Sequence, residues 1–139
     1  MNNEQLREIL LSAKTIASVG LSSSDEKESY HIAAYLQEQG YRIIPVNPTA
    51  KEILGEKAYA SLSEIPDKVD IVQLFRKSED VPPYVDEAIR IGAKVVWMQV
   101  GIENEQAAAK ARAAGLQVVM NACLRITHRT LIGPKPVSL

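Results

Sequence analysis

Apolar residues follow two alternating patterns along this chain. Short runs of mostly apolar residues are typical of strands buried on both faces, and stretches in which apolar residues return every three or four positions are typical of amphipathic helices. The runs predict strands over residues 16–19, 41–46, 69–75, 93–100 and 116–120, and the helical stretches lie over 6–13, 29–40, 82–91 and 104–114. Strands and helices therefore alternate along most of the chain.

Residues at the ends of these stretches support the assignment. Ser29 is suited to cap the second helix and Gly40 to end it. Pro82 begins the third helix and Gly92 closes it. Residues 50–66, between the second and third strands, predict short helical turns and loops.

The alternation predicts the fold class. Strands that are apolar on both faces and separated by helices belong to a parallel sheet with helices on both sides. Right-handed crossovers then give a doubly wound, Rossmann-like α/β sandwich of three layers with a five-stranded parallel sheet. We treat residues 1–139 as one domain, because 139 residues of which 46% are hydrophobic suffice for one core.

Charge and cysteine content narrow the partners. Sixteen basic and seventeen acidic residues are mixed along the chain, which argues against the basic stripe that nucleic acid requires. Residues 1–12 lack the features of a signal peptide, and no later run approaches the length of a membrane span. Cys123 is the one cysteine and has no zinc-site spacing around it. We expect a cytoplasmic protein with no metal and no membrane partner.

The carboxyl ends of the strands carry the candidate chemistry, because an open parallel sheet binds its ligand there. The first strand leads into a loop that opens onto a helix, whose free N–H groups favour an anion such as a nucleotide diphosphate. The residues at the carboxyl ends of the first four strands are Gly20, Ser22 and Ser23; Asn47 and Pro48; Phe75, Arg76 and Lys77; and Gln99 and Gly101. They offer hydroxyls, amides and cations without an acid–base pair, so no catalytic residue is assigned.

The first loop departs from the dinucleotide fingerprint. Only Gly20 stands where that motif has three glycines, and Ser22 and Ser23 fill the turn. The second strand ends in Asn47 and Pro48 rather than in the acidic residue that holds a ribose. These departures argue against an ordinary nicotinamide site. The alternative for Asn47 and Pro48 is that they only form a turn.

Short motifs spread over almost the whole chain carry a family resemblance. They are Val19-Gly20-Leu21-Ser22, Ser29-Tyr30, Ala34-Tyr35-Leu36, Gly40-Tyr41, Pro45-Val46-Asn47-Pro48, Ile53-Leu54-Gly55, Val69-Asp70-Ile71-Val72, Phe75-Arg76, Ser78-Glu79, Glu87-Ala88-Ile89, Gly92-Ala93-Lys94, Trp97, Gln99, Gly101, Asn104-Glu105 and Ala114-Gly115. In these motifs the chain resembles the small CoA-binding proteins, which are similar to the N-terminal nucleotide-binding domain of the succinyl-CoA synthetase alpha subunit.

The resemblance implies that coenzyme A binds across the strand ends. Its phosphates would lie near the loop at 20–23, its adenine near Asn47 and Pro48, and its pantetheine arm along 75–82. On charge alone, Lys27 and Arg42 are suited to its 3′-phosphate. The implied ligand-binding residues are Gly20, Leu21, Ser22, Ser23, Lys27, Asn47, Pro48, Phe75, Arg76, Val81, Pro82, Gln99 and Gly101.

The chain departs from the family pattern near its end, where an acid and a base are expected before the cysteine and an acid before the histidine. Here stand Asn121-Ala122-Cys123 and Thr127-His128. We therefore assign no chemistry to either side chain: Cys123 is expected to pack as a small hydrophobe and His128 to lie at a helix end.

Two further side chains have alternative roles. Arg76 suits a ligand diphosphate or an ion pair with Glu79 or Asp80 equally well. Trp97 lies in an apolar strand, which favours the core over an adenine platform.

Three functions follow as hypotheses. The favoured one is a non-catalytic carrier or regulatory module that binds CoA or an acyl-CoA. The second is an acyl-CoA enzyme component that acts with a partner, and the third is an NAD(P)-binding module supported by fold class alone. A protein partner or a homodimer, through an edge strand or the proline-rich tail at 133–139, stays open because the pattern does not require one.

Overall fold

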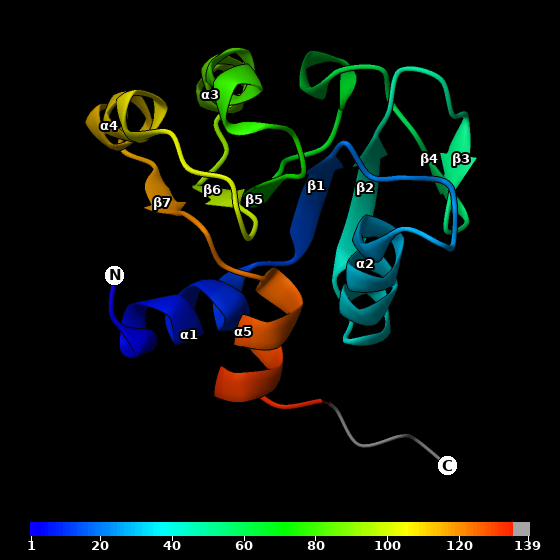
Figure 1. Cartoon of the computed structure of the whole chain (residues 1–139), viewed down its shortest axis with the longest axis horizontal. Helices are drawn as coiled ribbons and strands as arrows, with labels where there is room; N and C mark the ends of the chain where they lie inside the picture. Colours follow the sequence, from blue (N-terminus) through cyan, green and yellow to red (C-terminus); the bar gives the residue numbers. More distant parts are fainter. Residues whose placement is uncertain (135–139) are drawn as a thin grey trace.

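A five-stranded parallel sheet forms the centre of the molecule (Figure 1). Its strands are β1 (Thr15–Val19), β2 (Arg42–Val46), β5 (Ile71–Leu74), β6 (Val95–Met98) and β7 (Gln117–Val119), in the order β2-β1-β5-β6-β7. All neighbouring pairs are parallel, and Val19 at the end of β1 lies beside both Val46 and Leu74. This computed structural model describes residues 1–134, so most of the proline-rich tail lies outside the described residues. The predicted Rossmann-like fold is confirmed.

Helices cover both faces of the sheet, as the pattern predicted. One face carries α1 (Asn3–Ser12), α2 (Glu28–Glu38) and α5 (Leu124–Leu131), and the other carries α3 (Val81–Arg90) and α4 (Glu105–Ala113). Short 3₁₀ turns lie at Leu62–Glu64 and Ser78–Asp80. Among residues 1–134, no helix is long and apolar enough to cross a membrane.

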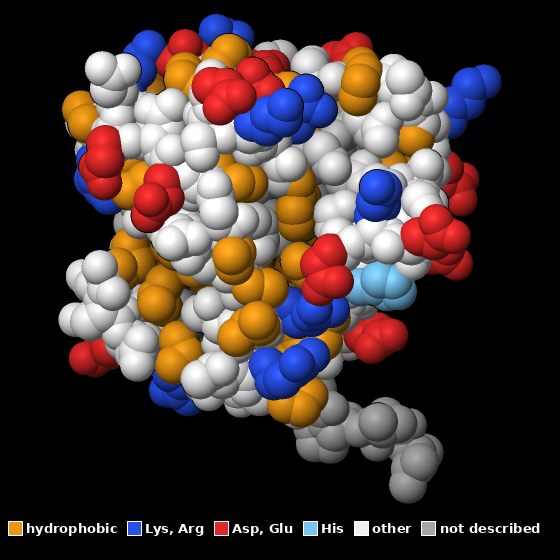
Figure 2. Space-filling view, viewed as in Figure 1, with side chains coloured by type: hydrophobic (Ala, Val, Ile, Leu, Met, Phe, Trp, Pro, Cys, Tyr) orange, Lys and Arg blue, Asp and Glu red, His pale blue; other side chains and the backbone are white. Residues whose placement is uncertain are grey.

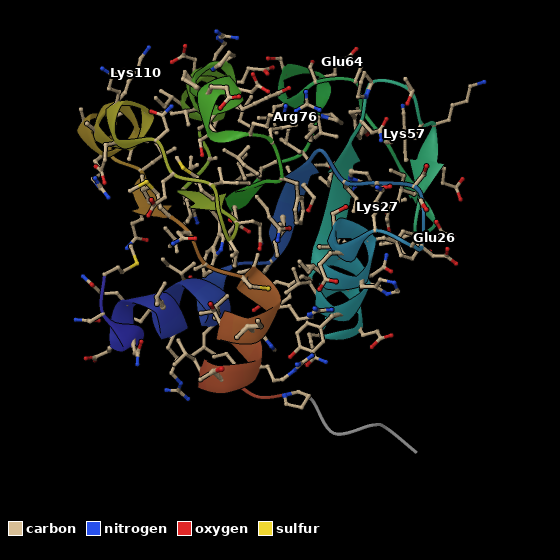
Figure 3. All side chains as sticks on the ribbon, viewed as in Figure 1. Glu26, Lys27, Lys57, Glu64, Arg76 and Lys110 are labelled. Carbon is tan, nitrogen blue, oxygen red and sulfur yellow. The ribbon has the colours of Figure 1, made fainter. Side chains whose placement is uncertain are left out.

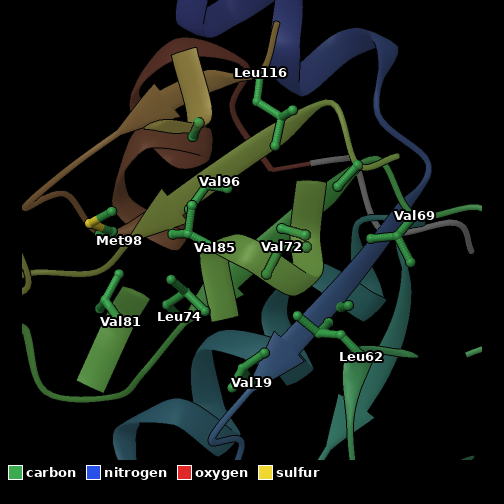
Figure 4. Close-up of a cluster of buried hydrophobic side chains, with 14 of the residues drawn as sticks. Val19, Leu62, Val69, Val72, Leu74, Val81, Val85, Val96, Met98 and Leu116 are labelled. Carbon is green, nitrogen blue, oxygen red and sulfur yellow. The ribbon is translucent and has the colours of Figure 1, made fainter. Parts of the chain in front are cut away.

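Each face has its own hydrophobic core. Figure 4 shows the core beneath α3, where Val72 and Val96 from the strands meet Val81 and Val85 from the helix. On the other face, Trp97 is fully buried and its indole N–H donates to the carbonyl oxygen of Ala122 at 2.9 Å. This confirms Trp97 as a core residue. Burial on both faces explains why the strands are apolar at consecutive positions.

The helix starts differ in how their amides are satisfied. Asn2 caps α1 and Asn104 caps α4 through side-chain hydrogen bonds, but α2 begins after Lys27 with no side-chain cap. The prediction that Ser29 caps this helix is wrong, because the Ser29 hydroxyl accepts from the Ser22 N–H at 3.1 Å instead. The first turn of α2 therefore keeps amides that can meet a ligand.

Two segments differ from the sequence prediction. Residues 50–66 contain an antiparallel hairpin, β3 (Glu52–Ile53) and β4 (Glu56–Lys57), rather than helical turns alone. Its turn residues Leu54 and Gly55 both have positive φ, which a two-residue hairpin turn of the common type requires. Leucine seldom adopts this conformation, so the sequence signal was weak. Helix α5 was not predicted, because only a helix end at His128 was expected there.

Candidate functional site

The sheet has its switch point between β1 and β5. The chain leaves β1 for β2 on one side, and β5 pairs with β1 on the other. In open parallel sheets, ligands bind at the carboxyl ends of the strands beside such a switch point. Gly20 and Phe75 stand at these ends, where the Gly20 N–H donates to the Val46 carbonyl and the Phe75 N–H to the Val19 carbonyl.

The backbone conformation and the close neighbours at position 20 require glycine there. Its φ of +84° lies in the region that favours glycine, and a β-carbon there would lie 3.1 Å from Cδ of Arg76 and 3.4 Å from Cβ of Phe75. The bare α-carbon leaves the loop backbone open to a ligand. The sequence assigned Gly20 to phosphate binding, and that role stays a prediction.

The loop after β1 is folded by its own serine hydroxyls. Ser22 Oγ accepts from the Ser24 N–H at 3.0 Å, and Ser24 Oγ accepts from the Glu26 N–H at 3.3 Å. Among residues 1–134, the N–H groups of Leu21 and Ser23 have no acceptor. Together with the uncapped start of α2, these amides form a cradle that suits an anion.

Two cations lie at this cradle. Arg76 and Lys27 are exposed and form no ion pair within the described part of the chain, so the alternative pairing of Arg76 with Glu79 or Asp80 is not observed. Figure 3 shows Arg76 near the carboxyl end of β1 and Lys27 beside α2, with Glu26 close to Lys27. Exposed cations next to free amides are donors that suit a phosphate.

Arg42 does not belong to this site. It begins β2, at the opposite edge of the sheet, and its Nη1 lies 2.6 Å from Oδ2 of Asp67. The expectation that it meets the 3′-phosphate is wrong, because charge alone does not place a residue at one end of a strand.

Asn47 ties the loop after β2 to the loop after β1. Its Nδ2 donates to the Leu21 carbonyl at 3.0 Å, and its Oδ1 accepts from the N–H groups of Thr49 and Ala50. Asn47 therefore forms the turn that the sequence offered as its alternative role. The same side chain also holds the loops after β1 and β2 together.

A pocket of about 650 Å³ opens beside Asn47. It is lined by Asn47, Pro48, Ala50, Lys51, Lys57, Ala58, Tyr59, Ala60 and Glu64. Lys57 lies over the Tyr59 ring, with Nζ 5.1 Å from its centroid. Sequence reasoning missed Lys57, Tyr59 and Glu64, because they come from residues 50–66, for which the pattern predicted only turns and loops. The one available signal was Tyr59, the single tyrosine of that segment.

A second pocket of about 360 Å³ lies on the other side of the loop after β1. It is lined by Glu28, Ser29, Ile32, Phe75, Gln99, Val100, Ile102, Cys123, Arg125 and Ile126. Figure 2 shows hydrophobic side chains exposed across the middle of the face of the molecule that is seen in Figure 1, above α5. Of the sequence-predicted residues, Phe75 and Gln99 meet here, whereas Arg125 and Ile126 were missed with α5.

Nine of the thirteen predicted residues line neither pocket: six belong to the cradle or its two cations, namely Gly20, Leu21, Ser22, Ser23, Lys27 and Arg76, and three lie elsewhere. Val81 is fully buried in the core beneath α3, and Pro82 is exposed at the start of that helix. Gly101 has a φ of +83°, and its N–H donates to Oδ1 of Asn121 at 2.7 Å. Gly101 therefore forms a turn that supports the edge of the sheet.

His128 has a structural environment. It lies in the last turn of α5 and is buried, as a helix-end residue. Its Nδ1 is 2.9 Å from the Tyr35 hydroxyl, and its ring meets those of Tyr35 and Tyr41 edge to face. Among residues 1–134, no group of three or more His, Cys, Asp or Glu side chains is placed to hold a metal ion.

A family model described as a CoA binding domain matches residues 14–129. The chain belongs to this CoA-binding family. The matched range contains the whole five-stranded sheet, the cradle formed by the loop after β1, and all residues that line the two pockets. The family resemblance carried by the sequence motifs is thereby confirmed.

Relatives of this CoA-binding domain fall into two groups. It is 42% identical to the uncharacterized protein YneT of Bacillus subtilis over 124 residues, which span 89% of this chain and 92% of that protein. It is 30% identical over 129 residues to the alpha subunit of acetate–CoA ligase (ADP-forming) II of Pyrococcus furiosus, spanning 84% of this chain and 28% of that subunit. The chain thus matches a small part of the ligase subunit.

Solved structures show the same division. A hypothetical protein from Pyrococcus horikoshii superposes with a TM-score of 0.93 at 44% identity, over 96% of this chain and 94% of that one. Acetyl-coenzyme A synthetase 1 (dinucleotide forming) from Ca. Korarchaeum cryptofilum gives a TM-score of 0.71 at 27% identity, over 84% of this chain and 31% of that one.

Proposed function

We propose that this CoA-binding domain binds coenzyme A or an acyl-CoA across the carboxyl ends of β1, β2 and β5, as a non-catalytic carrier or regulatory module. The observation that carries this proposal is the position of Arg76 over Gly20, with the amides of Leu21 and Ser23 beside it. Arginine and free amides are the donors that a diphosphate prefers.

The two pockets suit the two ends of the coenzyme. The pocket beside Asn47 has room for the adenosine, and Lys51 and Lys57 line it, so that with Lys27 they provide cations for the 3′-phosphate. The pocket that begins at Phe75 takes the pantetheine arm. Because the loop after β1 lies between them, the diphosphate of one extended ligand would cross the cradle.

Calorimetric titration tests this proposal with four ligands: CoA, dephospho-CoA, NAD and NADP. We expect CoA to bind, to raise the unfolding temperature and to bind more tightly than dephospho-CoA, because only CoA carries the 3′-phosphate. Binding of NAD or NADP without binding of CoA would refute the proposal and favour the nicotinamide hypothesis.

A second candidate is an acyl-CoA enzyme component that acts with a partner. It is favoured by the similarity to part of acetate–CoA ligase alpha subunits. The chain alone would then leave acetyl-CoA intact, whereas co-purification with a partner would yield acyl-CoA turnover. For either function we place the protein in the cytoplasm, where its one cysteine stays reduced.

A further inference from the structure

Two residues that line the second pocket each have a buried donor atom without a partner among the described residues. The Nε2 atom of Gln99, whose residue is 5% exposed, has no hydrogen-bond partner among the described residues, and neither does the buried Nε of Arg125. Both residues line this pocket. Burying a donor without a hydrogen-bond partner costs folding free energy, so such a donor is expected to meet a ligand or water.

The unpartnered atoms specify the chemistry of that ligand. Both are N–H donors, so they require an acceptor such as a carbonyl or carboxylate oxygen. The charge of Arg125 is already matched by the Glu28 carboxylate, to which its guanidinium donates. A pocket without an unmatched cation favours a neutral carbonyl over a carboxylate or a phosphate.

The remaining wall of the pocket is apolar. Ile32, Phe75 and Ile102 line it. Val100 and Ile126, which also line it, are 65% and 56% exposed. This lining suits a small hydrocarbon group attached to the carbonyl.

The pocket adjoins the cradle formed by the loop after β1. Phe75 stands beside Gly20 and also lines the pocket, and the pocket residue Ser29 accepts from the Ser22 N–H. A ligand whose diphosphate lies in the cradle can therefore extend its arm into the pocket without crossing the core.

We infer that this pocket binds the acyl thioester end of an acyl-CoA, with the thioester carbonyl oxygen accepting a hydrogen bond from Nε2 of Gln99. The inference rests on the proposed function and adds the acylation state of the ligand. Short-chain acyl thioesters are then the preferred form, and free CoA leaves the Gln99 donor without this acceptor.

The test compares acetyl-CoA with S-ethyl-CoA, a thioether of the same chain length that lacks the carbonyl oxygen. In calorimetry on the full chain, we expect acetyl-CoA to bind about tenfold more tightly, because the lost acceptor leaves a buried donor unpaired. In Gln99→Met, which keeps the length of the side chain but has no donor, the two ligands should bind equally. The exposed control Gln106→Met should keep the wild-type ratio.

Three results would overturn the inference, and they separate it from the proposed function. Equal binding of the two ligands to the wild-type chain refutes the carbonyl contact while the CoA site stands. An equal loss for CoA, acetyl-CoA and S-ethyl-CoA in Gln99→Met assigns Gln99 to a pantetheine amide instead. Absence of binding for all three ligands refutes the proposed function together with the inference.

Cys123 gives an independent readout that needs no variant. It lines the same pocket and is the one cysteine of the chain, so its alkylation by iodoacetamide reports on this pocket alone. Saturating acetyl-CoA, which has no free thiol to react, should slow the alkylation several-fold. An unchanged rate with acetyl-CoA bound would show that the acyl end lies elsewhere.

Discussion

The side chain of Arg76 packs over the α-carbon of Gly20. A β-carbon on Gly20 would lie 3.1 Å from Cδ of Arg76, which is closer than ordinary van der Waals contact. Gly20 follows β1 and Arg76 follows β5 by one residue more, so the pair spans the switch point of the sheet. This approach brings the Arg76 side chain beside the loop that carries the amides of Leu21 and Ser23.

Replacing Gly20 with alanine should separate binding from stability. The β-carbon would displace Arg76 and narrow the cradle, so we expect Gly20→Ala to bind CoA at least tenfold more weakly. The positive φ should also lower the free energy of unfolding by about 1–2 kcal/mol. Calorimetry measures the first effect and urea denaturation the second.

Gly92→Ala is the matched control for this change. Gly92 has a φ of +75°, close to that of Gly20, but a β-carbon there has no neighbour within 4 Å. It should lose similar stability and keep its affinity for CoA. Equal loss of affinity in both variants would mean that backbone strain, rather than the cradle, controls binding.

The charge of Arg76 should contribute to affinity in a salt-dependent way. We expect Arg76→Gln to weaken CoA binding about tenfold at low salt, because a charge-assisted bond to the diphosphate is lost. The loss should shrink as ionic strength rises, since exposed charges are screened. Lys68→Gln makes the same change of charge at an exposed position before β5, at the other edge of the sheet, and should leave binding unchanged. If both variants lost CoA affinity to a similar extent, the net charge of the protein rather than the position of Arg76 would explain the effect.

The sequence was sufficient for the sheet because its signal is local. Each strand is apolar at consecutive positions, and glycines mark the ends of the helices, so the order of elements follows from the pattern. Gly20, Asn47, Phe75 and Gln99 were also within reach, because parallel strands bring their carboxyl ends to one edge.

Contacts between distant segments were beyond the sequence. The hairpin that brings Tyr59 to the pocket depends on a leucine with positive φ, and α5 brings Arg125 to Glu28 across 97 positions of the chain. The family resemblance also placed Val81 beside the ligand, whereas the amphipathic face of α3 turns it into the core. Only the packed structure distinguishes these outcomes.

Asp70 should make stability depend on acid pH. Its Oδ2 accepts from the N–H groups of Lys14 and Thr15 at 2.9 and 3.0 Å. Burial acts to raise the pKa of Asp70, but these bonds and the charge of Lys94 outweigh it, so the pKa lies below its usual value. A carboxylate with a lowered pKa stabilises the fold above its unfolded pKa of about 4, and this is lost as the pH falls through the folded pKa.

Asp70→Asn tests this dependence. We expect the variant to lose about 1–2 kcal/mol of unfolding free energy at pH 7, because one acceptor for two strand-start amides becomes neutral. The difference from the wild-type chain should diminish as the pH falls from about 4, the unfolded pKa, toward the lower folded pKa at which Asp70 itself becomes protonated. Urea denaturation across this range measures it, and a difference independent of pH would contradict the assignment.

Tyr41 should give the opposite dependence, at alkaline pH. Its hydroxyl donates to the Leu10 carbonyl near the end of α1, and burial, followed by the neighbouring Tyr35, raises the pKa of Tyr41 to about 12. A group with a raised pKa contributes stability that is complete below its unfolded pKa of about 10 and is lost as the pH rises toward 12. Tyr41→Phe should therefore cost about 1 kcal/mol at pH 7, because the Leu10 carbonyl loses its donor. Between about pH 10 and 12 the wild-type chain should lose more unfolding free energy than Tyr41→Phe. Urea denaturation at each pH measures this difference. Equal losses in the two proteins would show that Tyr41 titrates as an exposed tyrosine.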